Sequence, residues 1–133
     1  MTDLLAAVGE VLLLWGHLET AMRERIAAIP RDRPEAPPKN ASVLSEWRKA
    51  EEQTQAGRVL QWEELLADIA EGAAIRNCLA HGLSSASANP LGSTEAQVVC
   101  RLKDGSDRTL TLSELKQAGR TLHELRMRVQ NLS

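Results

Sequence analysis

The feature that most constrains the fold is a long repeat of apolar side chains near the start of the chain. Between residues 3 and 29 they recur at steps of three and four positions, at Leu4, Val8, Val11, Trp15, Leu18, Met22, Ile26 and Ile29. This spacing places them on one face of an α-helix. A helix with one apolar face has to bury it against other elements, so the repeat predicts a packed helical domain.

Two more helices are predicted after a proline-rich segment. Pro30 ends the first helix, and the prolines within residues 31–38 predict an exposed loop. The second helix begins near Ser42, a residue type that caps helices, and runs toward Gly57. The third helix covers residues 59–81 and is followed by Gly82, which predicts its stop. Its repeated positions are Val59, Trp62, Leu66, Ile69, Ala73, Arg76 and Ala80.

The last third of the chain predicts a mobile loop over 84–94, a short hairpin and a final helix. The hairpin joins residues 97–102 to 108–111 through a two-residue turn at Asp104-Gly105. Thr111 and Glu114 have the spacing of a capping box, with Leu110 and Leu115 as a hydrophobic staple, and the helix spans 113–132. We therefore expect a single domain over residues 1–133. Its predicted class is all-α, an up-and-down helical bundle with a short β-hairpin before the last helix.

Charge and cysteine usage limit the partners and the compartment. The net charge of −2 argues against a general nucleic-acid coat, so any RNA binding has to be local. Arginines at positions 23, 25, 31 and 33, and again at 120, 126 and 128, are interpreted as solvated helix faces. Cys78 and Cys100 follow no secretory leader, which favours free thiols in a reducing cytoplasm. The apolar run at 11–15 is too short to span a membrane, so no membrane partner is expected.

Residues 76–82, Arg-Asn-Cys-Leu-Ala-His-Gly, carry the chemistry of this sequence. The Arg76 guanidinium is permanently charged and matches phosphate oxygens, whereas His81 can exchange protons near neutral pH. Asn77 and His81 are four residues apart on one helical face, with Arg76 at its edge, so the three could line one pocket. Arg76 also occupies a position of the apolar repeat. A guanidinium there is costly unless it is paired or lines a crevice, which favours a functional role.

This heptapeptide resembles the Arg-Asn-x-x-x-His-Gly form of the motif found in HEPN domains. The resemblance extends in helix order over residues 1 to about 82, and the segment 113–132 matches as a closing helix. HEPN domains are small helical proteins, many of which are metal-independent RNA nucleases that dimerise across this helix. The resemblance therefore implies a homodimeric RNA-cleaving toxin or antiphage effector of a bacterial defence system. A cognate antitoxin is then a candidate partner.

The predicted reaction is cleavage of RNA by its own 2′-hydroxyl. His81 would act as general base or acid, Arg76 would offset the charge on the non-bridging oxygens, and Asn77 would orient the phosphate or the imidazole. No metal and no cofactor is expected, because zinc needs four ligands and the pair Cys78 and His81 has no second pair nearby in the sequence. One histidine serves two oxygens poorly. The dimer implied by the resemblance would bring in a second Arg76 and His81.

Structural interpretations of the same residues remain open. His81 can be a helix-terminal residue favoured by the macrodipole, Asn77 an exposed polar residue, and Arg76 one half of a buried ion pair with Glu19. Glu19 is also the best candidate on the first helix for contacting the motif, with a solvated charge as its alternative. The functional alternatives are a catalytically inactive module that binds RNA or a nucleotide, and a protein-interaction bundle.

Overall fold

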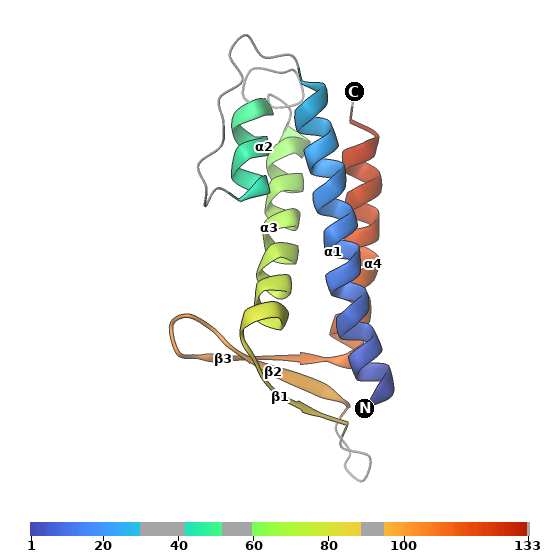
Figure 1. Cartoon of the computed structure of the whole chain (residues 1–133), viewed down its shortest axis with the longest axis vertical. Helices are drawn as coiled ribbons and strands as arrows, with labels where there is room; N and C mark the ends of the chain where they lie inside the picture. Colours follow the sequence, from blue (N-terminus) through green and yellow to red (C-terminus); the bar gives the residue numbers. More distant parts are fainter. Residues whose placement is uncertain (30–41, 52–59, 89–94, 133) are drawn as a thin grey trace.

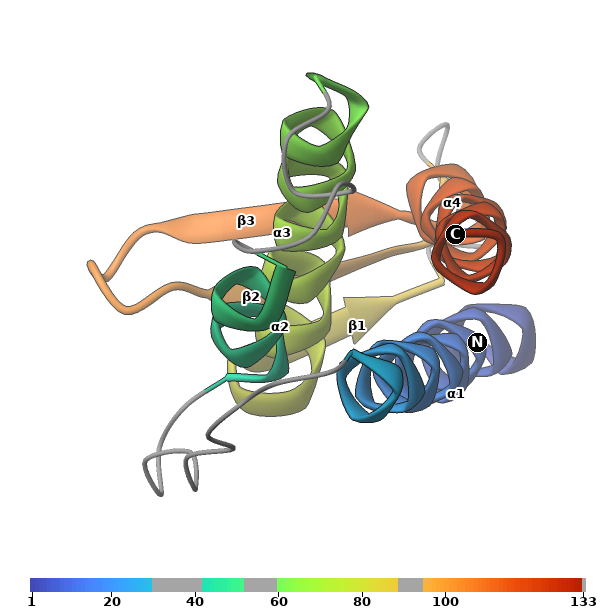
Figure 2. The same ribbon diagram turned by 90° about the horizontal axis from the view of Figure 1, so that it is seen from above.

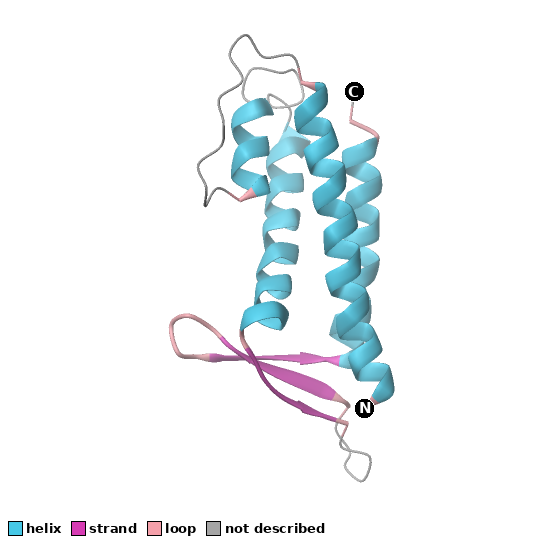
Figure 3. Cartoon of the chain, in the orientation of Figure 1, coloured by secondary structure: helices cyan, strands magenta, loops and turns pink. Residues whose placement is uncertain are grey.

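The computed structural model describes residues 1–29, 42–51, 60–88 and 95–132. In chain order these form α1 (Thr2–Ala28), α2 (Val43–Glu51), α3 (Leu60–His81), β1 (Leu83–Ser87), β2 (Gln97–Arg101), β3 (Asp107–Thr111) and α4 (Leu112–Gln130). The three long helices run side by side, and the small sheet lies across one end of them (Figures 1 and 3). The predicted helical bundle is thus confirmed in its main features.

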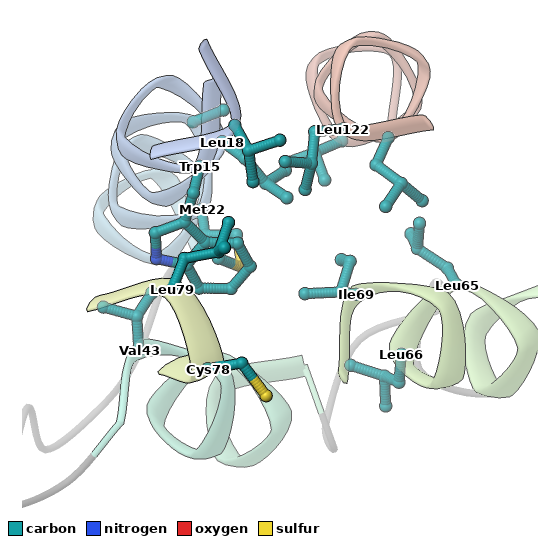
Figure 4. Close-up of a cluster of buried hydrophobic side chains, with 14 of the residues drawn as sticks. Trp15, Leu18, Met22, Val43, Leu65, Leu66, Ile69, Cys78, Leu79 and Leu122 are labelled. Atoms are coloured by element: carbon teal, nitrogen blue, oxygen red, sulfur yellow. The ribbon is translucent and has the colours of Figure 1, made fainter. Parts of the chain in front are cut away.

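Side chains from all four helices meet in one hydrophobic core (Figure 4). Helix α1 lies alongside α4 over its length, with α3 facing the pair and α2 against α1 and α3 (Figure 2). Gly72 permits close contact in the centre, because an added Cβ would lie 2.9 Å from a methyl of Leu122 and 3.9 Å from the Trp15 ring. Close packing of aliphatic side chains, together with tryptophan rings, therefore stabilises the bundle.

The short helix α2 contacts the bundle through an aromatic pair and a buried carboxylate, among other contacts. Trp47 meets Trp62 of α3 edge to face, with ring centroids 4.7 Å apart. Glu51 is completely buried and accepts hydrogen bonds from Arg25 of α1 at 2.5 Å and from the Trp47 indole at 3.1 Å. A buried carboxylate is tolerated here because a guanidinium and an indole N–H replace water around it.

The apolar repeat of α1 is covered within the chain itself. Each predicted large apolar position from Leu4 to Ile29 is less than a tenth exposed. The continuity of this repeat therefore does not by itself require a partner subunit, and the exposed apolar side chains of α1 are instead Leu5 and Leu13. By length and composition α1 also meets the criterion for a helix that could cross a membrane. Core helices and N-terminal signal sequences pass the same test.

The predicted hairpin is part of a larger sheet. Strands pair antiparallel in the order β1-β2-β3, so the fold class is a helical bundle with a three-stranded sheet before the last helix. Residues 83–87 form β1, and the prediction of a mobile loop from residue 84 is wrong over this strand. The sequence Leu-Ser-Ser-Ala-Ser shows no apolar alternation because β1 is an edge strand whose side chains are mostly exposed.

The β2–β3 connection differs from the predicted two-residue turn. Leu102 and Ser106 are joined by a backbone hydrogen bond of 2.8 Å, and Gly105 donates to the Leu102 carbonyl at 3.0 Å. Residues 103–105 therefore form a three-residue loop. Gly105 has a φ of +88°, the left-handed conformation expected for it from the sequence.

The two predicted helix caps are confirmed. The Ser42 hydroxyl accepts from the N–H of Ser45, in the first turn of α2, at 3.1 Å. Thr111 and Glu114 form the complete capping box at the start of α4, and Leu110 and Leu115 of the predicted staple are both buried. The proline-rich segment 31–38, the continuation of the second helix beyond residue 51 and the Val59 position lie outside the described residues.

Candidate functional site

The last turn of α3 opens onto a concave surface. Asn77 and His81, both exposed, line an open cavity of about 940 Å³. The remaining lining residues come from α3, from Gly82, from the start of β1 and from the β2–β3 hairpin: Ala74, Cys78, Gly82, Leu83, Arg101, Leu102, Lys103 and Arg108. The structure thus brings two of the predicted site residues into one cavity, in line with their spacing of one helical turn.

Arg76 lies at the edge of this arrangement. Its side chain is half-buried, and one guanidinium nitrogen donates to the Asn77 side-chain oxygen at 3.0 Å. Arg76 does not itself line the cavity among the described residues. Its hydrogen bond nevertheless connects it to Asn77, which does.

The expected apolar seam of α3 shifts before it reaches its end. Trp62, Leu66 and Ile69 are buried as predicted, but Ala73 and Arg76 are only half-buried and Ala80 is exposed. Near the sheet, burial moves to Cys78 and Leu79. The sequence pattern predicts that the same face of α3 is buried along the whole helix. In the structure the sheet covers a different face of the last turns. Arg76 is therefore not a buried core charge.

Gly82 holds the end of α3 against the sheet. Its N–H donates to the Cys78 carbonyl at 2.9 Å, and its carbonyl accepts from the Arg101 N–H at 2.7 Å. An added Cβ would lie only 2.4 Å from the Arg101 carbonyl oxygen. Gly82 follows the helix as predicted, yet its φ is not in the left-handed region. The glycine is needed because β2 passes close by.

Three cations of the hairpin were not predicted as site residues. Arg108 donates to Glu71 of α3 at 2.5 Å, and this hydrogen bond raises the pKa of its guanidinium. Arg101 contacts the Asp107 carboxylate at 3.3 Å, and Lys103 is in the exposed loop. In the sequence, these three cations flank the predicted turn, which is the one feature that could have marked them as site residues. Their position beside His81 depends on strand β1, which the sequence pattern does not predict.

Two thiols lie near the cavity, and one of them, Cys78, lines it. Cys78 and Cys100 are both free and buried. Burial raises the pKa of the Cys100 thiol, and the neighbouring Cys78 raises it further. The interpretation of Cys78 as a packed thiol is confirmed, with Cys100 of β2 as its neighbour.

Glu19 does not contact the motif. Its carboxylate accepts from the Trp15 indole and from Arg23, each at 3.1 Å. Neither contact involves Arg76, so the alternative of an Arg76–Glu19 ion pair is wrong for the described structure. Glu19 instead anchors Trp15 of the α1 face.

Neither metal-binding side chains nor similarity to known proteins identifies the function of this site. Within the described ranges, no three His, Cys, Asp or Glu side chains are placed to share a metal ion. Comparison with protein-family models, curated proteins and solved structures finds no match for this chain.

Proposed function

We propose that this chain is a metal-independent endoribonuclease whose active site is formed by Arg76, Asn77 and His81. The observation that carries the proposal is the cavity in which the exposed imidazole of His81 and the amide of Asn77 are placed among three cationic residues. An imidazole can move protons and the cations can attract a phosphate. The resemblance of residues 76–82 to the HEPN motif supports the same reaction class. A toxin or antiphage effector, with a cognate antitoxin, is the corresponding biological setting.

The proposed reaction uses the nucleophile of the substrate. The 2′-oxygen attacks the adjacent phosphorus, and the bond from phosphorus to the leaving 5′-oxygen breaks. His81 accepts the 2′-hydroxyl proton or gives a proton to the leaving oxygen. Asn77 orients the phosphate, and Arg76, held against Asn77 at 3.0 Å, supplies positive charge toward the non-bridging oxygens. The products are a 2′,3′-cyclic phosphate and a 5′-hydroxyl.

A two-fold homodimer completes this proposal. In-line displacement needs one group at the attacking oxygen and another at the leaving oxygen, on opposite sides of the phosphorus. His81 of the partner subunit can take the second role if both cavities open to a shared surface. The exposure of His81 leaves it free for such an arrangement.

The test is cleavage of a single-stranded RNA in excess chelator. Wild-type protein should cut it to the products named above, and His81→Ala should lose about 10²–10⁴-fold in turnover while still binding. His123→Ala is the matched control, because His123 is an exposed histidine of α4 that does not line the cavity. A substrate with 2′-deoxy substitution at the cut position should bind and stay intact. Cleavage of DNA, dependence on added magnesium, or a fully active His81→Ala protein would contradict the proposal.

A catalytically inactive RNA-binding module is the alternative function. It is favoured by one observation, namely that Arg76 lies outside the described cavity wall and donates to Asn77. In that case the wild-type protein should bind RNA and produce no cyclic phosphate at any protein concentration.

A further inference from the structure

The walls of the cavity are positively charged although the whole chain is acidic. The net charge of the protein is −2, yet Arg101, Lys103 and Arg108 line this cavity and, among its described lining residues, none is a carboxylate. A second cavity of about 290 Å³, between α3 and α4, has the opposite character, because Asp68, Glu71 and Glu114 line it beside Arg108. An anion approaching this end of the molecule is therefore directed to the cavity of His81.

The three cations, called here the hairpin cations, differ in how they are held. Arg108 is fixed by Glu71 at 2.5 Å, so it is a positioned charge with reduced freedom. Arg101 contacts Asp107 at 3.3 Å in an exposed pair, and such pairs stabilise a fold weakly, so its other nitrogens can engage a ligand. Lys103 has no ion pair with any described residue.

The carboxylates of the hairpin offset this charge only in part. Asp107 pairs with Arg101 in an exposed contact, which reduces the charge of that guanidinium but leaves its other nitrogens available. Asp104 accepts hydrogen bonds from the N–H and the hydroxyl of Ser106, which lower the pKa of its carboxyl and hold it in the turn. Neither aspartate is among the residues that line the cavity. The cavity thus presents cations and amide or imidazole groups to its contents.

We propose that the hairpin cations form a second phosphate subsite, which binds the backbone of single-stranded RNA next to the phosphate at His81. This inference rests on the proposed function for the position of the RNA. A cavity of about 940 Å³ is in the range that holds a nucleotide-sized ligand, and residues of the hairpin and of the end of α3 both line it. A single strand can enter it and adopt the in-line geometry, whereas an A-form duplex is recognised mainly from its shallow minor groove.

The proposed subsite recognises the charge of the phosphates and does not recognise the base or the sugar. Arginine and lysine contacts to phosphates set affinity and salt dependence but carry no sequence information directly. A single-stranded 2′-deoxy oligonucleotide should therefore bind through the same cations and remain uncut. This property allows binding to be measured separately from cleavage.

The experiment measures binding of a fluorescent single-stranded 2′-deoxy 12-mer by anisotropy over a range of salt concentrations. The test variant is Arg101→Gln with Lys103→Gln, and the control is Lys49→Gln with Lys116→Gln, two exposed lysines outside the cavity. Both double variants change the net charge equally. The hairpin variant should bind at least about tenfold more weakly, and its slope of log affinity against log salt should fall by about 0.7 for each phosphate that it no longer neutralises. The control should remain close to wild type.

Cleavage of the corresponding RNA separates this inference from the proposed function. The hairpin variant should raise KM with little change in kcat, because it loses binding common to ground and transition states. Equal weakening by the two double variants, unchanged binding by the hairpin variant, or no binding by the wild-type protein would overturn the subsite. A wild-type protein that binds through the hairpin cations but cuts no RNA would support the subsite and remove the proposed nuclease. Far-UV circular dichroism checks that each variant is folded.

Discussion

At the scale of residues, the end of α3 places three polar groups in different surroundings. His81 and Asn77 are exposed to the cavity, whereas Arg76 is half-buried and directed to the Asn77 side-chain oxygen. A guanidinium has five N–H donors in a planar fork, so a single contact with Asn77 leaves most of them available. The site residues themselves could be chosen from the sequence because their chemistry and helical spacing are local properties. Their environment could not, because it depends on where the sheet covers the helix.

Arg76→Lys tests whether RNA cleavage requires the planar guanidinium of Arg76. We expect this variant to keep its fold and to lose most of its RNA cleavage, because an ammonium cannot hold Asn77 and a phosphate in the same planar geometry. The measurement is kcat/KM on RNA together with the thermal unfolding midpoint. Arg120→Lys is the control, since Arg120 donates to the side-chain amide oxygen of Gln117 on α4, away from the cavity. Wild-type activity in Arg76→Lys would remove the phosphate role, and loss of folding would indicate a structural role.

At the scale of elements, helices were predictable and the sheet was predictable only in part. The bounds of α1 and α4 follow from their apolar repeats and from a local capping box, all of which can be read in one segment of sequence. The strand β1 has neither signal, because its pairing with β2 is a tertiary contact between Leu83 and Cys100. Because the sequence does not predict β1, it also does not predict that the hairpin lies close to His81. For this reason the hairpin cations could not be predicted as part of the candidate site.

Gly82→Ala tests how closely α3 and β2 approach. The added Cβ would lie 2.4 Å from the Arg101 carbonyl oxygen, a backbone atom that cannot rotate away, so the strand has to shift. We expect the free energy of unfolding to fall by about 1–3 kcal/mol in a urea titration, as for other overpacked sites. Gly9→Ala is the control, because an added Cβ there meets nothing within 4 Å. That variant should be more stable by about 0.5–1 kcal/mol, since alanine favours the helix. Equal effects of both changes would show that the Gly82 contact is not tight.

Oxidation tests the packing of α3 on β2 in a second way. Treatment with diamide should join Cys78 and Cys100 in one chain, with two protons and two electrons passing to the diamide, and the mass should fall by about 2 Da because two hydrogens leave. The two thiols are neighbours in the core, and Cys78 lines the cavity through which the reagent can enter. Burial raises the pKa of Cys100, so its thiolate is scarce near neutral pH and the reaction should accelerate as the pH rises. Cys100→Ser should abolish the intrachain bond. Disulfides formed only between chains would contradict the described packing.

At the scale of the whole molecule, the helical bundle contains the hydrophobic core, and the candidate site lies where the sheet meets α3. The four helices bury one hydrophobic core within a single chain, so the buried apolar repeat of α1 gives no argument for a partner subunit. The polar groups of the proposed reaction lie at the other end, where the sheet meets α3 (Figure 1). A dimer therefore has to be argued from the site, which needs a second proton-transfer group. Leu83, 44% exposed on β1 and lining the cavity, is an apolar contact available beside that site.

Light scattering tests this arrangement at high micromolar concentration. The proposed nuclease should have about twice the 14.6 kDa mass of one chain, with an interface near or above about 1,200 Å² as stable interfaces have. Leu83→Asp should shift the protein toward the monomer and reduce cleavage in parallel, because a charge at the shared surface would be desolvated on association. Met127→Asp is the matched control, since Met127 is 45% exposed on the last turns of α4, at the opposite end of the bundle. A wild-type monomer that cuts RNA would contradict the shared site, whereas a dimer that survives Leu83→Asp would place the interface on another face, such as the Leu5 and Leu13 side of α1.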